Sequence, residues 1–262
     1  MRNELALIKL GGSVVTFKEK PLTANFEAIN NIIRVITTIK IPLIIVHGGG
    51  SFGHYWSVKY DMHTKPDDYD PYGISIVHES MICLNQIIVN SMIKERLNAY
   101  AVMPSNFTSS HRPIIRKIDE LQDIAENGII PVTYGDIVHI NRRKYSILSG
   151  DVIMRILSQA LHPSKVIFAL NVDGIYKNIK TKETIKEIKN SNSNRSIDLS
   201  RVEADVTGGM RRKVTEALKI ARSGVDVLMV NGLNPERIIN AISGSAFEGT
   251  TIKGVGGKQQ SA

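Results

Sequence analysis

Short apolar runs that alternate with longer amphipathic segments constrain the fold of this chain more than any other feature of its sequence. Each run is rich in β-branched residues and apolar at nearly every position, as strands are when both faces of a parallel sheet are covered. The runs predicted as strands are 5–10, 42–47, 99–103, 129–133, 165–171 and 225–230.

Helical periodicity occupies the stretches between these runs. Between the first two, Phe26 and the isoleucines from Ile29 to Ile39 recur at helical spacing, with Thr23 as the predicted N-cap. The alternation of strand and helix predicts an α/β fold with a mostly parallel central sheet and helices on both sides. The other helical patterns span 78–97, 150–161, 211–223 and 235–243.

Two segments depart from this alternation. Residues 136–148 are predicted as a hairpin beside the main sheet, with two short strands around a turn that contains Arg142. Residues 177–200 are rich in Lys, Asn and Ser and weakly periodic, and we expect a mobile surface excursion there. A break in composition predicts a boundary between an N-terminal lobe, 1–163, and a C-terminal lobe, 164–262.

The charge of the chain favours anionic partners. The 33 Lys and Arg exceed the 25 Asp and Glu and give a net charge of +8. The basic residues are dispersed and only 6% of residues are aromatic, so no base-stacking surface for nucleic acid is indicated. A positive field also suits capture of a nucleotide and a phosphorylated substrate.

No apolar run approaches the roughly 20 residues that span a bilayer, and no secretory leader is evident, so a soluble cytoplasmic protein is expected.

The chain has one cysteine, Cys83, which excludes an intrachain disulfide and a cysteine-based metal site. It lies among apolar residues in a helical pattern and is predicted to be a small core residue. No set of side chains is predicted to bind a metal ion directly.

Three glycine-rich segments follow a strand or open a helix: 9–13 (KLGGS), 47–54 (HGGGSFGH) and 207–213 (TGGMRRK). Glycines at strand ends let the backbone approach a ligand closely and point consecutive N–H groups at it. A helix N-terminus behind such a turn adds positive potential, which favours phosphate. One such loop is as readily a structural turn, but three loops that each carry a Lys or His indicate a phosphate site.

Charged residues beside the loops fit phosphoryl transfer, which needs positive groups placed in advance around the moving group. Lys9 stands in an otherwise apolar strand and is costly to bury without an anionic partner, unless the strand is at an edge. Lys18 follows the first turn, and alone it would be an ordinary surface lysine. Lys213 lies one turn into a helix and His54 closes the second loop, and both are predicted to bind phosphate. Asp151 opens a helix, either as an N-cap or as an anion between two lysines.

A dinucleotide-binding site is a competing interpretation, because Gly48, Gly50 and Gly53 match G-x-G-x-x-G and Asp67 follows. Three observations count against it. The match follows the second strand, residues 54–71 do not read as a helix, and the other two loops would have no role. No G-x-x-x-x-G-K-[ST] occurs in the sequence, so a P-loop is excluded.

The amino acid kinase superfamily has motifs that resemble six segments in this order: IKLGGS, HGGGSFGH, YGD, SGD, VDGIY and VTGGMRRK. Within it, the loop that ends in His54 is similar to that of the isopentenyl phosphate kinases, chiefly archaeal enzymes, and SIVHESM and NPERI resemble them too. The resemblance covers about residues 5–253. It implies an open αβα sandwich, generally homodimeric, that phosphorylates isopentenyl phosphate with ATP in the alternative mevalonate route. It also implies Mg²⁺ held by the nucleotide rather than by a carboxylate cage.

The resemblance also implies a role for individual residues. The N-terminal lobe would bind the acceptor and carry catalytic lysines, and the C-terminal lobe would bind ATP. Lys18 would stabilise the transition state and Asp151 would organise the lysines. The catalytic set would be Lys9, Lys18, His54, Asp151 and Lys213. Residues at the acceptor phosphate would be Gly49, His54 and Gly150. Residues at the nucleotide would be Lys9, Gly11, Gly12, Ser13, Gly50, Asp173, Gly174, Tyr176, Gly209 and Lys213.

The acceptor tail requires a surface of another kind. An isopentenyl group offers carbon atoms and no hydrogen-bonding groups, so its pocket should be apolar. The scarcity of charge in the region concerned argues against an acidic amino acid as substrate. The predicted lining residues are Ile74, Val77, Met81 and Ile147.

Other functions stay open on the sequence alone. A related kinase for another phosphate or phosphonate, such as a fosfomycin kinase, shares a similar histidine loop. A non-catalytic nucleotide sensor has the same fold, although intact Lys9, Lys18 and Lys213 argue against it. A nucleic-acid binder would use the positive charge. Two positions depart from the family pattern, because Phe17 replaces an acidic residue before Lys18 and Asn171 stands where Asp is common.

Overall fold

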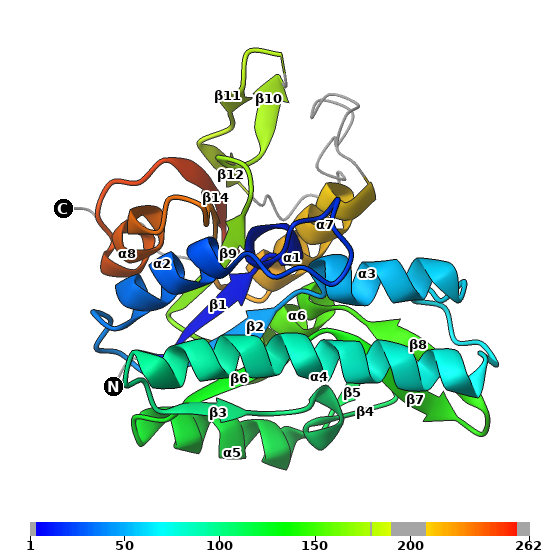
Figure 1. Ribbon diagram of the computed structural model, residues 1–262. Helices are drawn as coiled ribbons and strands as arrows, with labels where there is room; N and C mark the ends of the chain where they lie inside the picture. Colours follow the sequence, from blue (N-terminus) through cyan, green and yellow to red (C-terminus); the bar gives the residue numbers. More distant parts are fainter. Residues whose placement is uncertain (1–3, 179, 190–207, 256–262) are drawn as a thin grey trace.

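A mostly parallel sheet forms the centre of the computed structural model, which describes residues 4–178, 180–189 and 208–255 (Figure 1). Among these residues the sheet has eight strands in the order β12-β14-β13-β9-β1-β2-β6-β3. The strands from β13 to β3 are parallel, and β14 is antiparallel to β13. All six predicted strands lie in this sheet. The bounds are β1 Ala6–Leu10, β2 Leu43–His47, β3 Ala99–Ala101, β6 Ile130–Tyr134, β9 Lys165–Leu170, β12 Glu187–Lys189, β13 Val227–Asn231 and β14 Gly249–Lys253.

Helices cover both faces of the sheet, which confirms the predicted open αβα sandwich (Figure 1). α5, α6 and α7 pack over one hydrophobic core, and α1, α2, α4 and α8 pack over the other. Of the described helices, α4 has the length and composition to cross a membrane, and half of its apolar window is buried inside the protein. The bounds are α1 Gly12–Val15, α2 Phe26–Ile36, α3 Gly50–Lys59, α4 Pro71–Lys94, α5 Ile115–Glu126, α6 Gly150–Leu161, α7 Gly208–Arg222 and α8 Glu236–Ser243.

β1 lies between β2 and β9, and each of its residues is buried. Leu7 joins the core beneath α5, α6 and α7, whereas Ile8 joins the opposite core. Since side chains alternate along a strand, Lys9 projects to the same face as Leu7, where α6 packs on β1. Lys9 is only 3% exposed, so it is not an edge-strand lysine and must find its partner inside the protein.

A hairpin stands beside the sheet, as the sequence predicted, with β7 Asp136–Asn141 and β8 Lys144–Leu148 joined at Arg142. Ile137 of this hairpin packs with Val77 of α4 in a small third hydrophobic cluster. The described part of the chain also has short elements outside the main sheet: η1 Pro104–Asn106, β4 Thr108–Ser109, β5 Arg112–Pro113, β10 Tyr176–Asn178 and β11 Glu183–Thr184.

Several predicted boundaries were wrong. The N-cap of α2 is Asn25, whose side chain accepts the Ala28 N–H at 3.1 Å, and not Thr23. α4 begins seven residues before the predicted 78, because Asp70 caps it and Pro71 starts its first turn. α5 was not predicted at all. The predicted mobile excursion, 177–200, overlaps β10 and contains β11 and β12, and its residues 179 and 190–200 lie outside the described residues.

Two further predictions were wrong. Residues 54–59, predicted not to be helical, belong to α3, so this argument against a dinucleotide site fails. The apolar residues of α3 follow no single face, which is why periodicity missed it. Cys83 is exposed rather than buried, and its thiol donates to the Glu79 carboxylate at 2.9 Å. Helical spacing alone does not say which face of α4 meets the core.

Candidate active site

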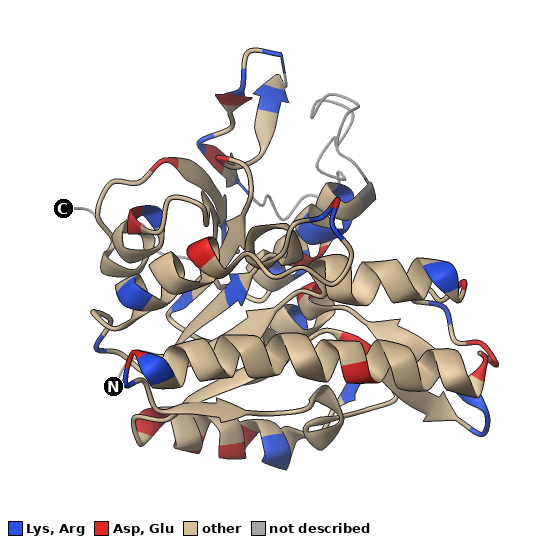
Figure 2. Ribbon diagram, viewed as in Figure 1, with Lys and Arg blue, Asp and Glu red and all other residues tan. Residues whose placement is uncertain are grey.

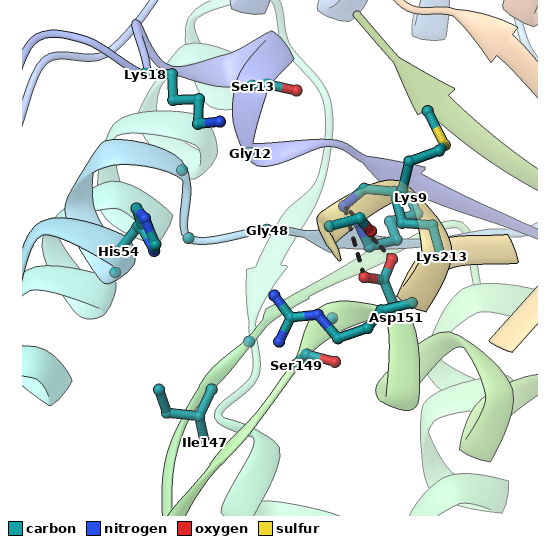
Figure 3. A pocket seen from close by; sticks show the side chains of 18 of the residues that line it. Lys9, Gly12, Ser13, Lys18, Gly48, His54, Ile147, Ser149, Asp151 and Lys213 are labelled. Carbon is teal, nitrogen blue, oxygen red and sulfur yellow. Dashed lines mark hydrogen bonds and ion pairs between the residues drawn. The ribbon is translucent and has the colours of Figure 1, made fainter. Parts of the chain in front are cut away.

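One cavity of about 860 Å³ opens at the carboxyl ends of β1, β2 and β9 (Figure 3). β2, β6 and β3 extend the sheet on one side of β1, whereas β9 and β13 extend it on the other side. The cavity therefore lies where the strand order reverses. Ligands of open α/β sheets bind at such switch points. The predicted site residues that line it are Lys9, Gly12, Ser13, Lys18, Gly49, Gly50, His54, Val77, Met81, Ile147, Gly150, Asp151, Gly174, Tyr176, Gly209 and Lys213.

Three predicted site residues do not line this cavity. The Gly11 N–H donates to the Ala169 carbonyl at 2.9 Å, so it continues the sheet instead of facing a ligand. Ile74 packs against the third hydrophobic cluster, behind the cavity wall. The Asp173 carboxylate is bound by the side chains of Arg237 and Asn231. Asp173 therefore holds the loop after β9 in place, and its neighbours Gly174 and Tyr176 line the cavity.

The first two glycine loops touch each other, and this contact requires glycine at Gly12 and Gly50. A Cβ on Gly12 would lie 2.3 Å from the Gly50 nitrogen, and Gly50 has a φ of 48°. Thr16 joins the loops, because its hydroxyl donates to the Gly12 carbonyl at 2.7 Å and accepts the Ser51 N–H at 2.9 Å. Glycines of both turns, Gly12 in the first and Gly48 to Gly50 in the second, thus lie side by side in the wall of the cavity.

His47 fixes the second loop from behind. Its ring is fully buried, stacks on Tyr134 and lies 3.1 Å from the Gly48 carbonyl through Nδ1. Burial lowers the pKa of His47 to about 4, so the ring is neutral near pH 7 and has one N–H. The Gly48 carbonyl at Nδ1 and the Asn85 side-chain oxygen, 3.2 Å from Nε2, can both only accept, so the single N–H of the ring donates to one of these two oxygens. Since the Gly48 carbonyl points toward His47, the Gly49 N–H in the same trans peptide points the opposite way.

Asp151 lies between two lysines (Figure 3). Its carboxylate is 3.1 Å from the Lys9 Nζ and 3.7 Å from the Lys213 Nζ. Burial alone would raise the pKa of Asp151, but the two ammonium groups hold it below its usual value. Burial and the charge of Lys9 lower the pKa of Lys213. Asp151 is not the N-cap of α6, because the Ser149 hydroxyl accepts the Val152 N–H.

A second ion pair holds α6 against α7. Arg155 lies one turn after Asp151, and its Nε is 2.7 Å from the Glu216 carboxylate, which is buried between the helices. Lys219 binds the other oxygen of Glu216 at 2.6 Å. These contacts fix the position of α7 and therefore of the Lys213 ammonium.

Lys18 and His54 lie on the opposite side of the glycine loops from Lys9 and Lys213 (Figure 3). Lys18 belongs to a loop that a bridge between Thr16 and Ala24 closes, and His54 lies in the second turn of α3. At the start of α3 the Ser51 N–H donates to Thr16, and the next two N–H groups donate to the Gly49 carbonyl. The N–H groups of Gly49 and Gly50, which line the cavity, are therefore left to face an anion. Two cationic ends with backbone donors between them suit two phosphate groups placed end to end.

Apolar side chains line the rest of the cavity, and the part between α4 and the β7–β8 hairpin is its apolar end. Val77 and Met81 of α4 and Ile147 of β8 line the apolar end, as predicted, and Met62 extends it. Apolar residues that the sequence analysis missed line the other end: Leu170, Val172, Ile175 and Met210. Arg212 was also missed, although the RRK run beside Lys213 signalled it.

No group of three or more His, Cys, Asp or Glu that could hold a metal ion occurs in the described part of the chain. The two carboxylates that line the cavity are already paired, Asp151 with lysines and Asp136 with His78. These residues fit a divalent cation carried by nucleotide phosphates better than one held by a protein cage.

Comparisons with known proteins agree with this arrangement. The model of the amino acid kinase family matches residues 4–231, and the chain belongs to that family. The isopentenyl phosphate kinase of Thermoplasma acidophilum is 34% identical over 95% of this chain and 100% of its own length. The isopentenyl phosphate kinase of Methanothermobacter thermautotrophicus is 31% identical over 95% of this chain and 99% of its own.

Solved structures give the same result. A crystal structure of the T. acidophilum isopentenyl phosphate kinase product complex superposes with a TM-score of 0.79 at 30% identity. That alignment covers 95% of this chain and all of the other. A carbamate kinase from Giardia lamblia superposes with a TM-score of 0.68 at 14% identity, which shows the shared fold alone.

Proposed function

We propose that this protein transfers the γ-phosphoryl group of ATP to isopentenyl phosphate and so makes isopentenyl diphosphate and ADP for isoprenoid biosynthesis. The observation that carries the proposal is one cavity with two cationic sides, glycine-loop donors between them and an apolar end without free charge. An apolar tail next to a phosphate needs this combination of surfaces. The full-length similarity to isopentenyl phosphate kinases supports it.

In the reaction, an oxygen of the acceptor phosphate attacks the γ-phosphorus of ATP, and the bond to the β-phosphate oxygen breaks. Negative charge spreads over the oxygens of the moving group and on the leaving ADP. No side chain forms a covalent bond. The protein contributes the alignment of the two anions and fixed positive groups around them.

The position of each residue in the cavity determines whether it binds the acceptor phosphate or the phosphates of ATP. His54 and the Gly49 N–H hold the acceptor phosphate, and the Gly50 N–H faces the nucleotide. Lys9 and Lys213 bind the ATP phosphates, and Asp151 keeps the two ammonium groups apart and correctly oriented. The remaining residues at the phosphates are Gly12, Ser13, Gly150, Gly209 and Arg212.

Lys18 acts on the transition state in this scheme. It lines the cavity between the first glycine loop and His54, so its ammonium is available to charge that develops during transfer. Phe17, which replaces the acidic residue of related kinases, is partly exposed and stacks with Lys20. Lys18 thus has no carboxylate directly before it in the chain.

A Mg²⁺ ion bound to ATP would supply additional positive charge to the phosphates. The chain's own residues hold the nucleotide so that this ion needs no protein carboxylate. A homodimer also fits the surface, because edge strand β3 and its neighbours expose large apolar side chains. These side chains are Ile93, Tyr100, Met103, Ile114, Ile115 and Ile129.

The test is a steady-state assay of ADP release with a panel of acceptors: isopentenyl phosphate, fosfomycin, carbamate, glutamate and aspartate. Isopentenyl phosphate should be preferred over every other acceptor, with isopentenyl diphosphate as the product by mass spectrometry. Preference for fosfomycin or for an acidic amino acid would contradict the proposal. ATP binding without turnover of any acceptor would indicate a nucleotide sensor instead.

A further inference from the structure

The wall of the cavity contains a buried acid that the reaction scheme above does not use. Asp136, the first residue of β7, lines the cavity, and its side chain is 3% exposed. An ionised carboxylate in the wall of a cavity that takes two anions opposes their binding. A buried charge without a partner is also costly to the fold. Asp136 therefore needs a cation that reaches it from outside the cavity.

His78 of α4 is this partner. Its Nδ1 lies 2.7 Å from one Asp136 oxygen, and the other oxygen accepts the Ile137 N–H at 2.7 Å. The His78 side chain is 39% exposed, so the pair reaches from the cavity wall to the protein surface. Each oxygen of Asp136 thus has a hydrogen-bond partner, and protonated His78 offsets the negative charge of the carboxylate.

The pair joins the two walls of the apolar end of the cavity. One wall is α4, where Val77 precedes His78 and Met81 lies one turn further on. The other wall is the β7–β8 hairpin, where Ile137 follows Asp136 and pairs in register with Ile147. The His78–Asp136 bond crosses between these elements beside the residues that would contact the acceptor tail.

We propose that the His78–Asp136 pair positions the β7–β8 hairpin against α4 and thereby restricts the cavity to acceptors with a short alkyl tail. The proposal rests on the function proposed above. When the bond is broken, the hairpin is free to move away from α4. The pocket then loses its fit to a short tail and admits longer ones.

Protonation of His78 should control this bond. The hydrogen bond to Asp136 raises the pKa of His78 above its ordinary value, whereas burial raises the pKa of Asp136. The stabilising charge on His78 is thus fully present below the ordinary histidine pKa and is lost as pH rises through the raised one. Among the described residues, Asp136 is the only charged group that shifts the pKa of His78. The titratable groups on the elements packed against α4 are Glu27, Arg34, His54, Tyr55, Lys59, Tyr100, Tyr134, Asp136 and His139.

The test uses Asp136→Asn, His78→Phe and the double variant, with kinetics for isopentenyl, hexyl and decyl phosphates. Each single variant should raise KM for isopentenyl phosphate about tenfold and change KM for ATP less than about twofold. The preference for isopentenyl over decyl phosphate should fall by a similar factor. The double variant should be no worse than either single one, because both changes remove the same bond. Asp226→Asn, which breaks an ion pair with Lys253 outside the cavity, is the matched control and should change neither KM.

Two outcomes would overturn the proposal. One is an equal rise of KM for both substrates, which would mean a general loss of structure. The other is an unchanged acceptor KM and tail preference in variants that fold normally. If Asp136→Asn does not fold, the half-exposed His78→Phe still decides the question, together with the wild-type pH profile. In that profile KM for isopentenyl phosphate should rise toward alkaline pH, and His78→Phe should remove the dependence.

A measurement without substrate separates this inference from the proposed function. In wild-type protein, the His78 ring should titrate by NMR at a higher pH than in Asp136→Asn. If the wild-type enzyme prefers another acceptor, the proposed function fails. The inference is then tested with that acceptor: its KM should rise in the variants while KM for ATP stays nearly unchanged. An unshifted His78 titration contradicts the pair itself.

Discussion

At the scale of single residues, Lys18 is the sharpest test of how the site accelerates transfer. Lys18→Ala should lower kcat by about 100-fold or more, because a positive group at the developing charge acts mainly in the transition state. The dissociation constant for ATP should change by less than about threefold. Single-turnover kinetics and nucleotide titration measure the two effects. Lys20→Ala, on the same loop but stacked on Phe17, is the control. Equal losses in kcat and ATP affinity would mean that Lys18 only binds the nucleotide and does not stabilise the transition state.

His47 tests whether a residue that touches no substrate orients the glycine loop. His47→Phe keeps an aromatic ring on Tyr134 but removes the ring nitrogen beside the Gly48 carbonyl. His47→Asn places an amide nitrogen near the position of Nδ1, where it can donate to that carbonyl. We expect kcat/KM for the acceptor to fall about tenfold in the first variant and less in the second. Identical kinetics in the two variants, at equal thermal stability, would contradict this role.

At the scale of elements, the ion pair between α6 and α7 should decide how firmly Lys213 is held. Arg155→Gln leaves the buried Glu216 with Lys219 as its one remaining cation, and Glu216→Gln leaves Arg155 without its carboxylate. Each should cost about 1–3 kcal/mol in the free energy of unfolding. KM for ATP should rise with little change in the acceptor KM. The double variant should cost less than the sum of the single ones, measured by chemical denaturation. Glu120→Gln, in the exposed pair with Lys117, should cost less than about 0.5 kcal/mol.

Elements with one clear period were predictable, and elements without one were not. β1, β2, β9 and β13 are buried on both faces and read as continuous apolar runs, so their positions followed from the sequence. α3 buries Phe52 together with two serines, whereas its Tyr55 and Val58 are exposed, so no apolar stripe marks it. α5 is an exception, because its buried residues Ile118, Leu121 and Ala125 recur at helical spacing and the sequence analysis nevertheless missed it.

The site was predictable where a residue type is unusual in its local context. Lys9 in an apolar strand needs an anion, and the sequence analysis found both it and Asp151. Asp173 looked like a nucleotide contact, but Arg237 and Asn231 occupy its carboxylate, and these residues come from a distant part of the chain. The pairing of His78 with Asp136 likewise depends on tertiary contacts between α4 and β7 that no local pattern encodes.

At the scale of the whole molecule, the distribution of charge bears on which anions the protein binds. Lys and Arg are scattered over several elements in Figure 2, and no continuous stripe follows one face of the ribbon drawn there. The buried cations are instead at the cavity, where strands of both halves of the chain meet. Ligands that bind there contact residues from β1 to α7 and should stabilise the molecule as one unit.

Thermal unfolding measures this coupling. A non-hydrolysable ATP analogue at 100 times its dissociation constant should stabilise the fold by about 2.7 kcal/mol. For a chain of this size that corresponds to a rise in Tm of roughly 5–10 °C. Isopentenyl phosphate should add a further rise when the analogue is already bound, because the two anions occupy different ends of one cavity. Both shifts should shrink as salt is added, since they depend on charge. Duplex DNA at equal phosphate concentration should give no shift, and a salt-sensitive shift with DNA would favour a nucleic-acid binder instead.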